Sequence, residues 1–150
     1  MPHPVEYRQG NLFTAEEGLA LAHGCNCQGV MGAGIALQFQ RCYPLMYNEY
    51  TSRCKSGIFL PGTVMGWSPC LETGGRLILN LATQDYPGPR SRLEWIEAAL
   101  MCAIETHPGI IGIAMPRIGA GFGGLDWEDV RQVIEKVAMT TEVKLIVYSL

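Results

Sequence analysis

Two glycine-rich segments constrain the fold of this chain more than any other feature of its sequence. Residues 29–35 read Gly-Val-Met-Gly-Ala-Gly-Ile, the first glycine loop, and residues 118–124 read Ile-Gly-Ala-Gly-Phe-Gly-Gly, the second glycine loop. Each follows an apolar run of strand length and leads to a stretch with helical spacing of apolar residues. Because glycine adopts positive φ and permits close approach to its backbone, both segments are predicted to be loops that join a strand to a helix.

The rest of the chain continues this alternation. Strands are predicted over residues 5–7, 19–25, 63–67, 76–81, 110–115 and 143–148. Helices are predicted over residues 33–41, 45–56, 92–106 and 126–139, with a turn or short helix over 15–17. The pattern predicts an α/β fold, a three-layer α/β/α sandwich with a mixed, mostly parallel central sheet, in which residues 1–150 form a single domain.

Local signals predict how several of these elements begin and end. Residues 72–75, Glu-Thr-Gly-Gly, have the chemistry of a hairpin turn, which makes the sheet mixed. Ser91 is expected to cap the third helix, with Glu94 completing a capping box. Asp126 is expected to cap or open the last helix.

Composition narrows the class of protein. With 48% hydrophobic and 17% charged residues, the 150-residue chain is expected to fold around a core. A net charge of −3, with only three lysines, argues against a protein that binds a nucleic-acid backbone. No apolar run reaches ~18 residues and the N-terminus lacks the pattern of a signal peptide, so the protein is predicted to be cytoplasmic and to make no membrane contact.

The six cysteines are expected to be free thiols, because no secretory signal accompanies them. Cys25 and Cys27 are the only close pair. They lack the second pair of cysteines or the histidines that a zinc site needs, and small thiols pack well on a buried strand. No metal site and no cofactor are therefore expected.

Both glycine loops are candidates for binding an anion. The N–H groups in the first turn of a helix have no partner within the helix, and the helix dipole is positive at that end. Two such loops at the carboxyl edge of a sheet could hold a diphosphate from both sides with uncharged donors. The alternative is that the glycines only form tight turns, since neither loop matches a P-loop or the usual dinucleotide fingerprint.

Four segments together resemble a macrodomain, the ADP-ribose-binding module, and the resemblance covers essentially the whole chain. They are Val-Glu-Tyr-Arg-Gln-Gly-Asn-Leu at residues 5–12, Asn-Cys-Gln-Gly-Val-Met-Gly-Ala-Gly-Ile-Ala at 26–36, Pro-Arg-Ile-Gly-Ala-Gly at 116–121 and Val-Tyr-Ser-Leu at 147–150. The chain is most similar to the branch that holds terminal ADP-ribose protein glycohydrolases, antitoxins that remove ADP-ribose from DNA, and yeast-type ADP-ribose 1''-phosphate phosphatases.

The resemblance implies roles for residues at both ends of an ADP-ribose ligand. Asn11 takes the place of an acidic residue that accepts a hydrogen bond from the adenine amino group, and its carbonyl can accept that bond without charge. Leu12 would add backbone contacts beside the base. Tyr148 and Leu150 would wall the adenine pocket, although Tyr148 could instead belong to the core. Asn26 would reach the distal ribose.

The resemblance further implies that the two glycine loops hold the diphosphate from opposite sides. The residues concerned are Gly32, Ala33, Gly34 and Ile35 in the first loop, and Gly119, Ala120, Gly121 and Phe122 in the second. Phe122 would also lie near the distal ribose, with a place in the core as its alternative.

The catalytic residues are where this chain departs from the relatives it resembles. The glycohydrolase subgroup uses a lysine where this chain has Gln84, and its human-type member has an aspartate where this chain has Gly123. Glutamine can neither form a Schiff base nor act as a base. The phosphatase-like members instead have a histidine that matches His23, a candidate for activating water or protonating a leaving group, with Asp85 as its acidic partner. The alternatives are a buried strand histidine and a loop or capping carboxylate.

Two functions are consistent with these expectations. The first is a hydrolase acting at the distal ribose of an ADP-ribose derivative, either removing a 1''-phosphate or cleaving a link to protein or DNA; there His23, Asp85 and Gln84 are the catalytic candidates. The second is a reader that binds ADP-ribose without turnover, which the missing lysine favours. The expected partner is ADP-ribose or an ADP-ribosylated molecule, and nucleic acid is expected only as an ADP-ribosylated substrate.

Overall fold

Six short strands pair into one mixed sheet in the order β1-β6-β5-β2-β4-β3, seen in the computed structural model, which describes residues 1–69 and 75–150. All neighbouring strands run parallel except β3 and β4, which are antiparallel as the hairpin prediction requires. The turn predicted at 72–75 falls mainly outside the described residues. The strands are β1 (Glu6–Gln9), β2 (Ala20–Cys25), β3 (Val64–Trp67), β4 (Ile78–Ala82), β5 (Gly112–Met115) and β6 (Lys144–Ser149).

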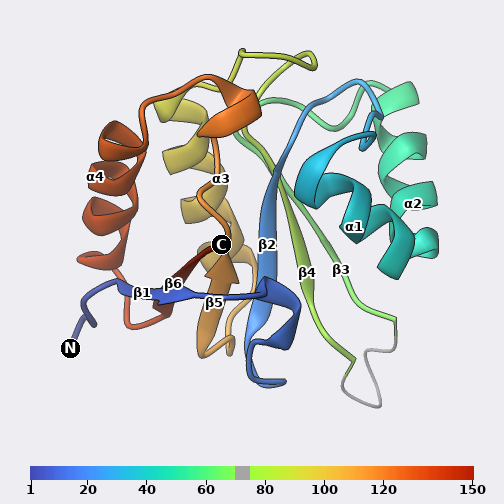
Figure 1. Ribbon diagram of the computed structural model, residues 1–150. Helices are drawn as coiled ribbons and strands as arrows, with labels where there is room; N and C mark the ends of the chain where they lie inside the picture. Colours follow the sequence, from blue (N-terminus) through green and yellow to red (C-terminus); the bar gives the residue numbers. More distant parts are fainter. Residues whose placement is uncertain (70–74) are drawn as a thin grey trace.

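Helices cover both faces of this sheet (Figure 1). On one face lie α1 (Gly34–Cys42) and α2 (Pro44–Lys55), and on the other lie α3 (Leu93–Thr106) and α4 (Trp127–Ala138). The expected three-layer α/β/α sandwich is therefore confirmed. The ends of every expected strand and long helix fall within two residues of the prediction.

The sheet buries apolar side chains on both faces, which is why its strands read as continuous apolar runs. In β4, Leu79 and Leu81 belong to the core on the α3 and α4 side, whereas Ile78 and Ala82 belong to the core on the α1 and α2 side. Successive residues of a strand point to opposite faces, so one apolar strand contributes to two cores. No helix among the described residues has the length and apolar character needed to cross a membrane.

One of the two predicted helix caps is present in the structure and the other is not. Asp126 caps α4 by accepting a hydrogen bond from the Glu128 amide at 3.0 Å, which confirms that prediction. The capping box at Ser91 is wrong: Arg92 is the N-cap of α3, no side chain caps it, and the Ser91 hydroxyl donates to Gln84 instead. The Ser91 hydroxyl therefore makes a tertiary hydrogen bond instead of capping the helix.

A turn or a short helix was expected over residues 15–17. The structure has a turn there, in which the Leu19 amide donates to the Glu16 carbonyl at 3.0 Å, and the short helix lies earlier, as the 3-10 turn η1 (Leu12–Thr14). The side chain of Asn11 starts this turn by accepting a hydrogen bond from the Phe13 amide at 3.0 Å. An asparagine two residues after the end of β1 thus caps the start of this turn.

Candidate functional site

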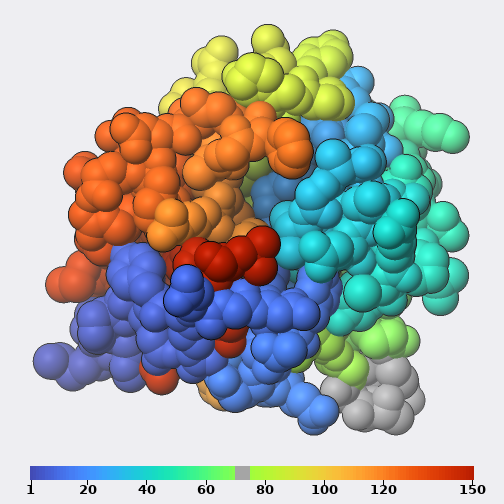
Figure 2. Space-filling view, viewed as in Figure 1, coloured from blue at the N-terminus to red at the C-terminus, as the bar shows by residue number. Residues whose placement is uncertain are grey.

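A cleft of about 500 Å³ opens at the carboxyl ends of β5, β2 and β4. The two glycine loops form its facing walls, and residues 83–91, here called the rim segment, close its end beyond β4. Figure 2 shows the hollow between the second glycine loop in orange and α1 in cyan. The lining residues are Gly24, Cys25, Asn26, Val30, Met31, Gly32, Ala33, Ile35, Ala36, Thr83, Gln84, Pro87, Gly88, Ser91, Pro116, Arg117, Ile118, Gly119, Ala120, Phe122 and Gly123.

The first glycine loop leads into a helix whose N-terminus has no side-chain cap. Ala33 is the N-cap of α1 in an extended conformation, and the first turn carries no acidic residue. Gly34 follows with φ of +59°, a conformation that favours glycine. The first-turn N–H groups therefore lack both intrahelical and capping partners, which makes this end of the cleft suited to an anion.

Asn26 braces the first glycine loop rather than presenting a free side chain. Its Nδ2 donates to the Val30 carbonyl at 2.8 Å, and its Oδ1 accepts from the Gln28 amide at 2.9 Å. The Tyr50 hydroxyl, from α2, donates to the same Oδ1 at 3.0 Å. Asn26 lines the cleft as expected, but its amide already has protein partners on both sides.

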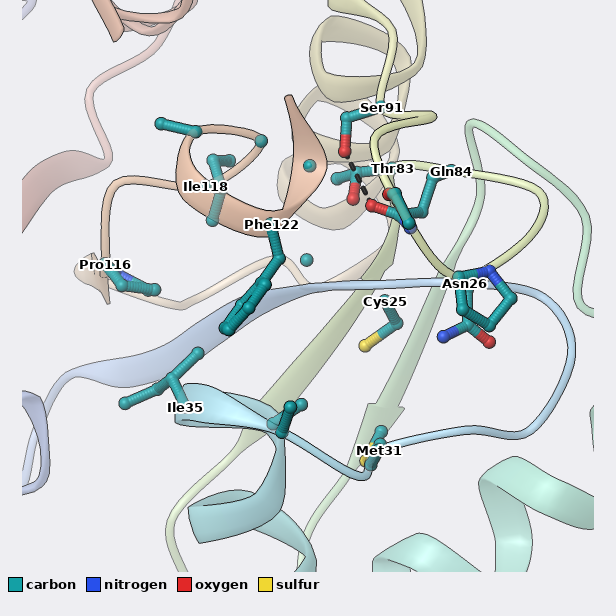
Figure 3. A pocket seen from close by; sticks show the side chains of 18 of the residues that line it. Cys25, Asn26, Met31, Ile35, Thr83, Gln84, Ser91, Pro116, Ile118 and Phe122 are labelled. Carbon is teal, nitrogen blue, oxygen red and sulfur yellow. Dashed lines mark hydrogen bonds between the residues drawn. The ribbon is translucent and has the colours of Figure 1, made fainter. Parts of the chain in front are cut away.

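The second glycine loop is held tightly against α3. Gly119 and Gly121 have φ of +75° and +68°, and a Cβ added at Gly119 would lie 2.6 Å from the Ile96 side chain. Phe122 stays 76% exposed, so it does not belong to the core. A Cβ at Gly34 would lie 3.1 Å from the Phe122 ring, which therefore bridges the mouth of the cleft between the two loops (Figure 3).

Six of the eight residues expected to hold the diphosphate line the cleft. They are Gly32, Ala33, Ile35, Gly119, Ala120 and Phe122. Gly34 and Gly121 belong to the same two loops but do not line the cavity. The structure thus brings the two loops to opposite sides of one space, which spacing along the chain could only suggest.

Gln84 lies on the cleft wall with every polar atom of its side chain engaged. Its Nε2 donates to the carbonyls of Tyr86 and Gly88 at 2.7 and 3.0 Å, and its Oε1 accepts from the Ser91 hydroxyl at 2.7 Å (Figure 3). The side chain therefore ties the rim segment into a closed loop. The same Ser91 donates its amide to the Gly123 carbonyl at 3.1 Å, which joins the rim segment to the second glycine loop.

Asp85 does not line the cleft. Arg90 donates to both of its carboxylate oxygens, at 2.7 and 2.6 Å, and this partner holds the pKa of the carboxyl well below its usual range. A permanently charged, paired carboxylate is a poor proton carrier near neutral pH. The arrangement matches the alternative considered for Asp85, a carboxylate that organises its loop.

His23 is fully buried behind the cleft and does not line it. Its ring stacks on Phe39 at 3.9 Å between centroids, and its Nε2 lies 2.7 Å from Asn80 Oδ1. Because Asn80 Nδ2 donates to the Met65 carbonyl, Oδ1 is the acceptor and Nε2 must carry a hydrogen. Burial lowers the pKa of His23 to about 4. The expectation of a histidine beside the distal ribose, titrating near neutrality, is not met, and the structure gives His23 its alternative role in the core.

The residues expected at the adenine end lie farther along the same edge of the sheet. Asn11 follows β1 and Tyr148 is near the end of β6, and both strands run parallel to β5. Tyr148 is buried but for a small fraction of its surface, Leu12 is buried, and Leu150 is fully exposed at the chain end. None of the four lines the cavity, which ends before β6.

Sequence reasoning missed several lining residues, of which Thr83, Ser91 and Arg117 are polar. Thr83 directly follows β4 and Arg117 lies two residues after β5, so their place after a strand was a usable signal. Among the described residues, the lining has no carboxylate, imidazole or lysine amine, and Arg117 is its one charged side chain. The guanidinium of Arg117 stacks over Trp127 at 5.1 Å. Burial raises the pKa of the Cys25 thiol well above its usual value, so the thiol stays protonated.

Comparison with known proteins gives the family. The Macro domain model matches residues 22–134. A DNA ADP-ribosyl glycohydrolase of Mycobacterium tuberculosis is 36% identical over 147 residues, which are 96% of this chain but only 42% of the relative's length. The human ADP-ribose glycohydrolase OARD1 is 31% identical over 149 residues, covering 97% of this chain and 91% of the relative.

Solved structures agree with the sequence comparison. The macrodomain of Mycobacterium tuberculosis DarG superimposes with a TM-score of 0.84 at 36% identity and covers 97% of both chains. The macrodomain of Thermus aquaticus DarG gives a TM-score of 0.86 at 34% identity. Because the Macro domain model matches more than half of the chain, at residues 22–134, the chain belongs to the Macro domain family.

Proposed function

We propose that this protein binds the ADP-ribose part of an ADP-ribosylated molecule in the cleft and hydrolyses the bond at the distal ribose. The observation that carries the proposal is the pair of glycine loops on opposite walls of a cavity of about 500 Å³. Relatives that are named as glycohydrolases acting on ADP-ribose or on ADP-ribosylated DNA support the reaction class.

In this proposal the diphosphate lies between the N-terminus of α1 and the second glycine loop, where backbone N–H groups face it. The distal ribose lies toward Asn26 and Gln84, beyond the ends of β2 and β4. The base lies toward Asn11 and Tyr148, beyond the ends of β6 and β1. Strand order supports this layout, because β1, β6, β5, β2 and β4 present their carboxyl ends along one edge in that sequence.

The catalytic contribution of the chain is positioning rather than proton transfer by a side chain. His23 is buried and Asp85 is paired with Arg90, so neither supports a general-base role at the distal ribose. The groups left at that end are neutral, chiefly Thr83 and Gln84. We propose that the Thr83 hydroxyl and the second lone pair of Gln84 Oε1 hold the attacking water against the bound ribose, because Gln84 Nε2 already donates to Tyr86 and Gly88. Correct orientation of the water alone can lower the reaction barrier substantially.

A reader function is the second candidate. It is favoured by the chemistry of the lining, which has no carboxylate, imidazole or lysine amine among the described residues. A reader needs the diphosphate loops and the base end but no positioned water. Binding alone therefore does not separate the two candidates, and turnover must be measured.

The test offers the protein three substrates: ADP-ribose 1''-phosphate, a mono-ADP-ribosylated protein, and DNA carrying ADP-ribosyl thymidine. We expect release of product from at least one, and no release by Gly121→Glu, which places a carboxylate in the second glycine loop, next to the cavity wall, where it would repel the diphosphate. ADP-ribose binding by calorimetry without release from any substrate would favour the reader. No binding of ADP-ribose would refute both candidates.

A further inference from the structure

The cleft ends at the rim segment in a wall of side chains whose hydrogen-bond directions are fixed. Gln84 Nε2 has two hydrogens, and it donates both to backbone carbonyls, those of Tyr86 and Gly88. The Ser91 hydroxyl donates its one hydrogen to Gln84 Oε1 (Figure 3). What these two lining residues can still offer a ligand is therefore an acceptor, at Gln84 Oε1 and at Ser91 Oγ.

Thr83 adds a buried hydroxyl to the same wall. The residue is 1% exposed, it lines the cleft, and its hydroxyl makes no hydrogen bond within the described part of the chain. No fully enclosed side-chain polar atom of that part lacks a partner, so the Thr83 oxygen must touch the open space of the cavity. A Cβ at Gly24 would lie 2.7 Å from this oxygen, so the glycine near the end of β2 leaves the room that the hydroxyl occupies. A buried hydroxyl with an unused hydrogen points to a polar group of the ligand at this wall.

The wall carries no charge that a phosphate group could use. Among the described residues, the one charged side chain that lines the cleft is Arg117, which follows β5, and β2 separates β5 from the strand that leads into the rim segment. Asp85 and Arg90 pair with each other and do not line the cavity. The side-chain donors left at this end are the Thr83 hydroxyl and the second hydrogen of Asn26 Nδ2, and both are neutral.

From this wall, and resting on the proposed function, we infer that the site selects substrates whose distal ribose carries an uncharged group, through an ester or N-glycosidic bond, and rejects ADP-ribose 1''-phosphate. Gln84 Oε1 and Ser91 Oγ would lie toward the oxygens of a 1''-phosphate, and acceptors that face each other repel. The phosphate would also lose hydrogen bonds to water that two neutral donors do not replace.

An uncharged group has no such loss, and the two acceptors can bind hydroxyls of the ribose itself. The diphosphate avoids the same cost because it lies between the glycine loops, where the first-turn N–H groups of α1 have no other partner. The cleft is therefore suited to anions along its glycine loops and to neutral groups at its rim.

The first experiment compares ADP-ribose, its 1''-O-methyl glycoside and ADP-ribose 1''-phosphate by calorimetry with the parent protein. We expect the methyl glycoside to bind within about threefold of ADP-ribose, and the 1''-phosphate to bind about tenfold more weakly or worse, the usual consequence of unmatched hydrogen bonds at a charged group. No inorganic phosphate should be released from the 1''-phosphate.

A charge added at the rim tests whether electrostatics is the cause. Pro87 and Pro89 are both exposed, but only Pro87 lines the cleft. Pro87→Lys should bring the affinity of the 1''-phosphate about fivefold closer to that of the methyl glycoside, because an ammonium group can then pair with the phosphate. Pro89→Lys is the matched control: it adds the same charge outside the cavity and should leave the ratio unchanged.

Thr83→Val tests whether the ribose reaches this wall, with circular dichroism to check that the variant is folded. We expect about fivefold weaker binding of ADP-ribose, the worth of one neutral hydrogen bond, and unchanged binding of ADP, which ends at the diphosphate. Equal effects on the two ligands would place the ribose elsewhere and overturn the inference.

Two further results would overturn the inference and leave the proposed function standing. One is a parent protein that binds the 1''-phosphate as tightly as the methyl glycoside, or that releases phosphate from it. The other is an equal change of the affinity ratio in Pro87→Lys and Pro89→Lys. If the folded parent binds neither ADP-ribose nor the methyl glycoside, the proposed function itself fails and the inference falls with it.

Discussion

The contact between Ser91 and Gly123 leads to a prediction that a double-mutant cycle can measure. A Cβ added at Gly123 would lie 2.4 Å from the Ser91 hydroxyl oxygen and 3.1 Å from its Cβ. No positive φ is involved at this glycine, so the cost of Gly123→Ala comes from packing alone. To make room, the Ser91 hydroxyl must turn away and give up its hydrogen bond to Gln84.

The magnitudes follow from these contacts. Ser91→Ala removes one hydrogen bond of 2.7 Å, worth about 1 kcal/mol of unfolding free energy. Gly123→Ala should cost about 2 kcal/mol, because it overpacks a tight contact and breaks the same bond. In the double variant the 2.4 Å contact no longer exists, so we expect a total about 1 kcal/mol smaller than the sum of the two single effects.

Urea unfolding followed by circular dichroism measures each corner of the cycle. The matched control is Gly32→Ala, whose added Cβ would lie no closer than 3.9 Å to the Val30 side chain. Its effect should add to that of Ser91→Ala within about 0.5 kcal/mol. If Gly123→Ala and Ser91→Ala were equally additive, the argument that Gly123 makes room for the hydroxyl would be refuted.

Three further predictions concern the two loops and the core. Gly121→Glu should abolish ADP-ribose binding in calorimetry while unfolding free energy falls by only about 1 kcal/mol, since a Cβ there meets nothing within 4 Å and only the φ of +68° is strained; unchanged affinity would remove the second glycine loop from the site. Asn11→Ala should lower both stability, through loss of the η1 cap, and ADP-ribose affinity, each by about 1 kcal/mol. Binding of ribose-5-phosphate should stay the same, and equal losses for both ligands would separate Asn11 from the base. The pKa of His23 is about 4 in the folded protein, against 6.5 for an ordinary histidine. Between these values the unfolded chain binds a proton that the buried ring does not. The free energy of unfolding should therefore be highest above pH 6.5 and fall by about 3 kcal/mol as the pH is lowered to 4. In urea titrations His23→Gln should lack that part of the pH dependence, and an unchanged pH dependence would contradict the neutral, buried assignment.

The fold could be predicted well from the sequence, because the spacing of apolar residues distinguishes strands that are buried on both faces from the helices that cover them. In α4, Val130, Ile134 and Val137 are buried at helical spacing, and Asp126 caps the helix as its position suggested. The two glycine loops could be predicted equally well, because in a parallel sheet a loop that joins a strand to the following helix lies at the carboxyl edge of the sheet. Where the loops meet, at Phe122 over Gly34, needed the structure.

Short polar side chains are where sequence reasoning failed. Ser91 has a helix start within reach, but its hydroxyl donates to a tertiary partner, Gln84, instead. The sequence pattern predicted the local hydrogen bonds of a capping box at Ser91. It gave no sign that the hydroxyl would bond to Gln84, seven residues earlier in the chain. The prediction for His23 was wrong for a different reason. His23 lies inside β2, two residues before the strand ends at Cys25, so its ring stacks on Phe39 in the core and does not reach the cleft.

The two residues that depart from the glycohydrolase pattern, Gln84 and Gly123, lie against the same side chain in the folded protein. Gln84 stands where that subgroup has a lysine, and Gly123 stands where its human-type member has an aspartate; 39 residues separate them in the sequence. In the structure both contact Ser91, because its hydroxyl donates to Gln84 Oε1 and occupies the space that a side chain at residue 123 would need. A larger residue at 123 would push the hydroxyl off Gln84, which would then keep only the two hydrogen bonds that its Nε2 donates to Tyr86 and Gly88. Residues 84 and 123 are therefore coupled through Ser91, and a variant that restores one charged residue alone should disturb the rim segment before it restores any chemistry.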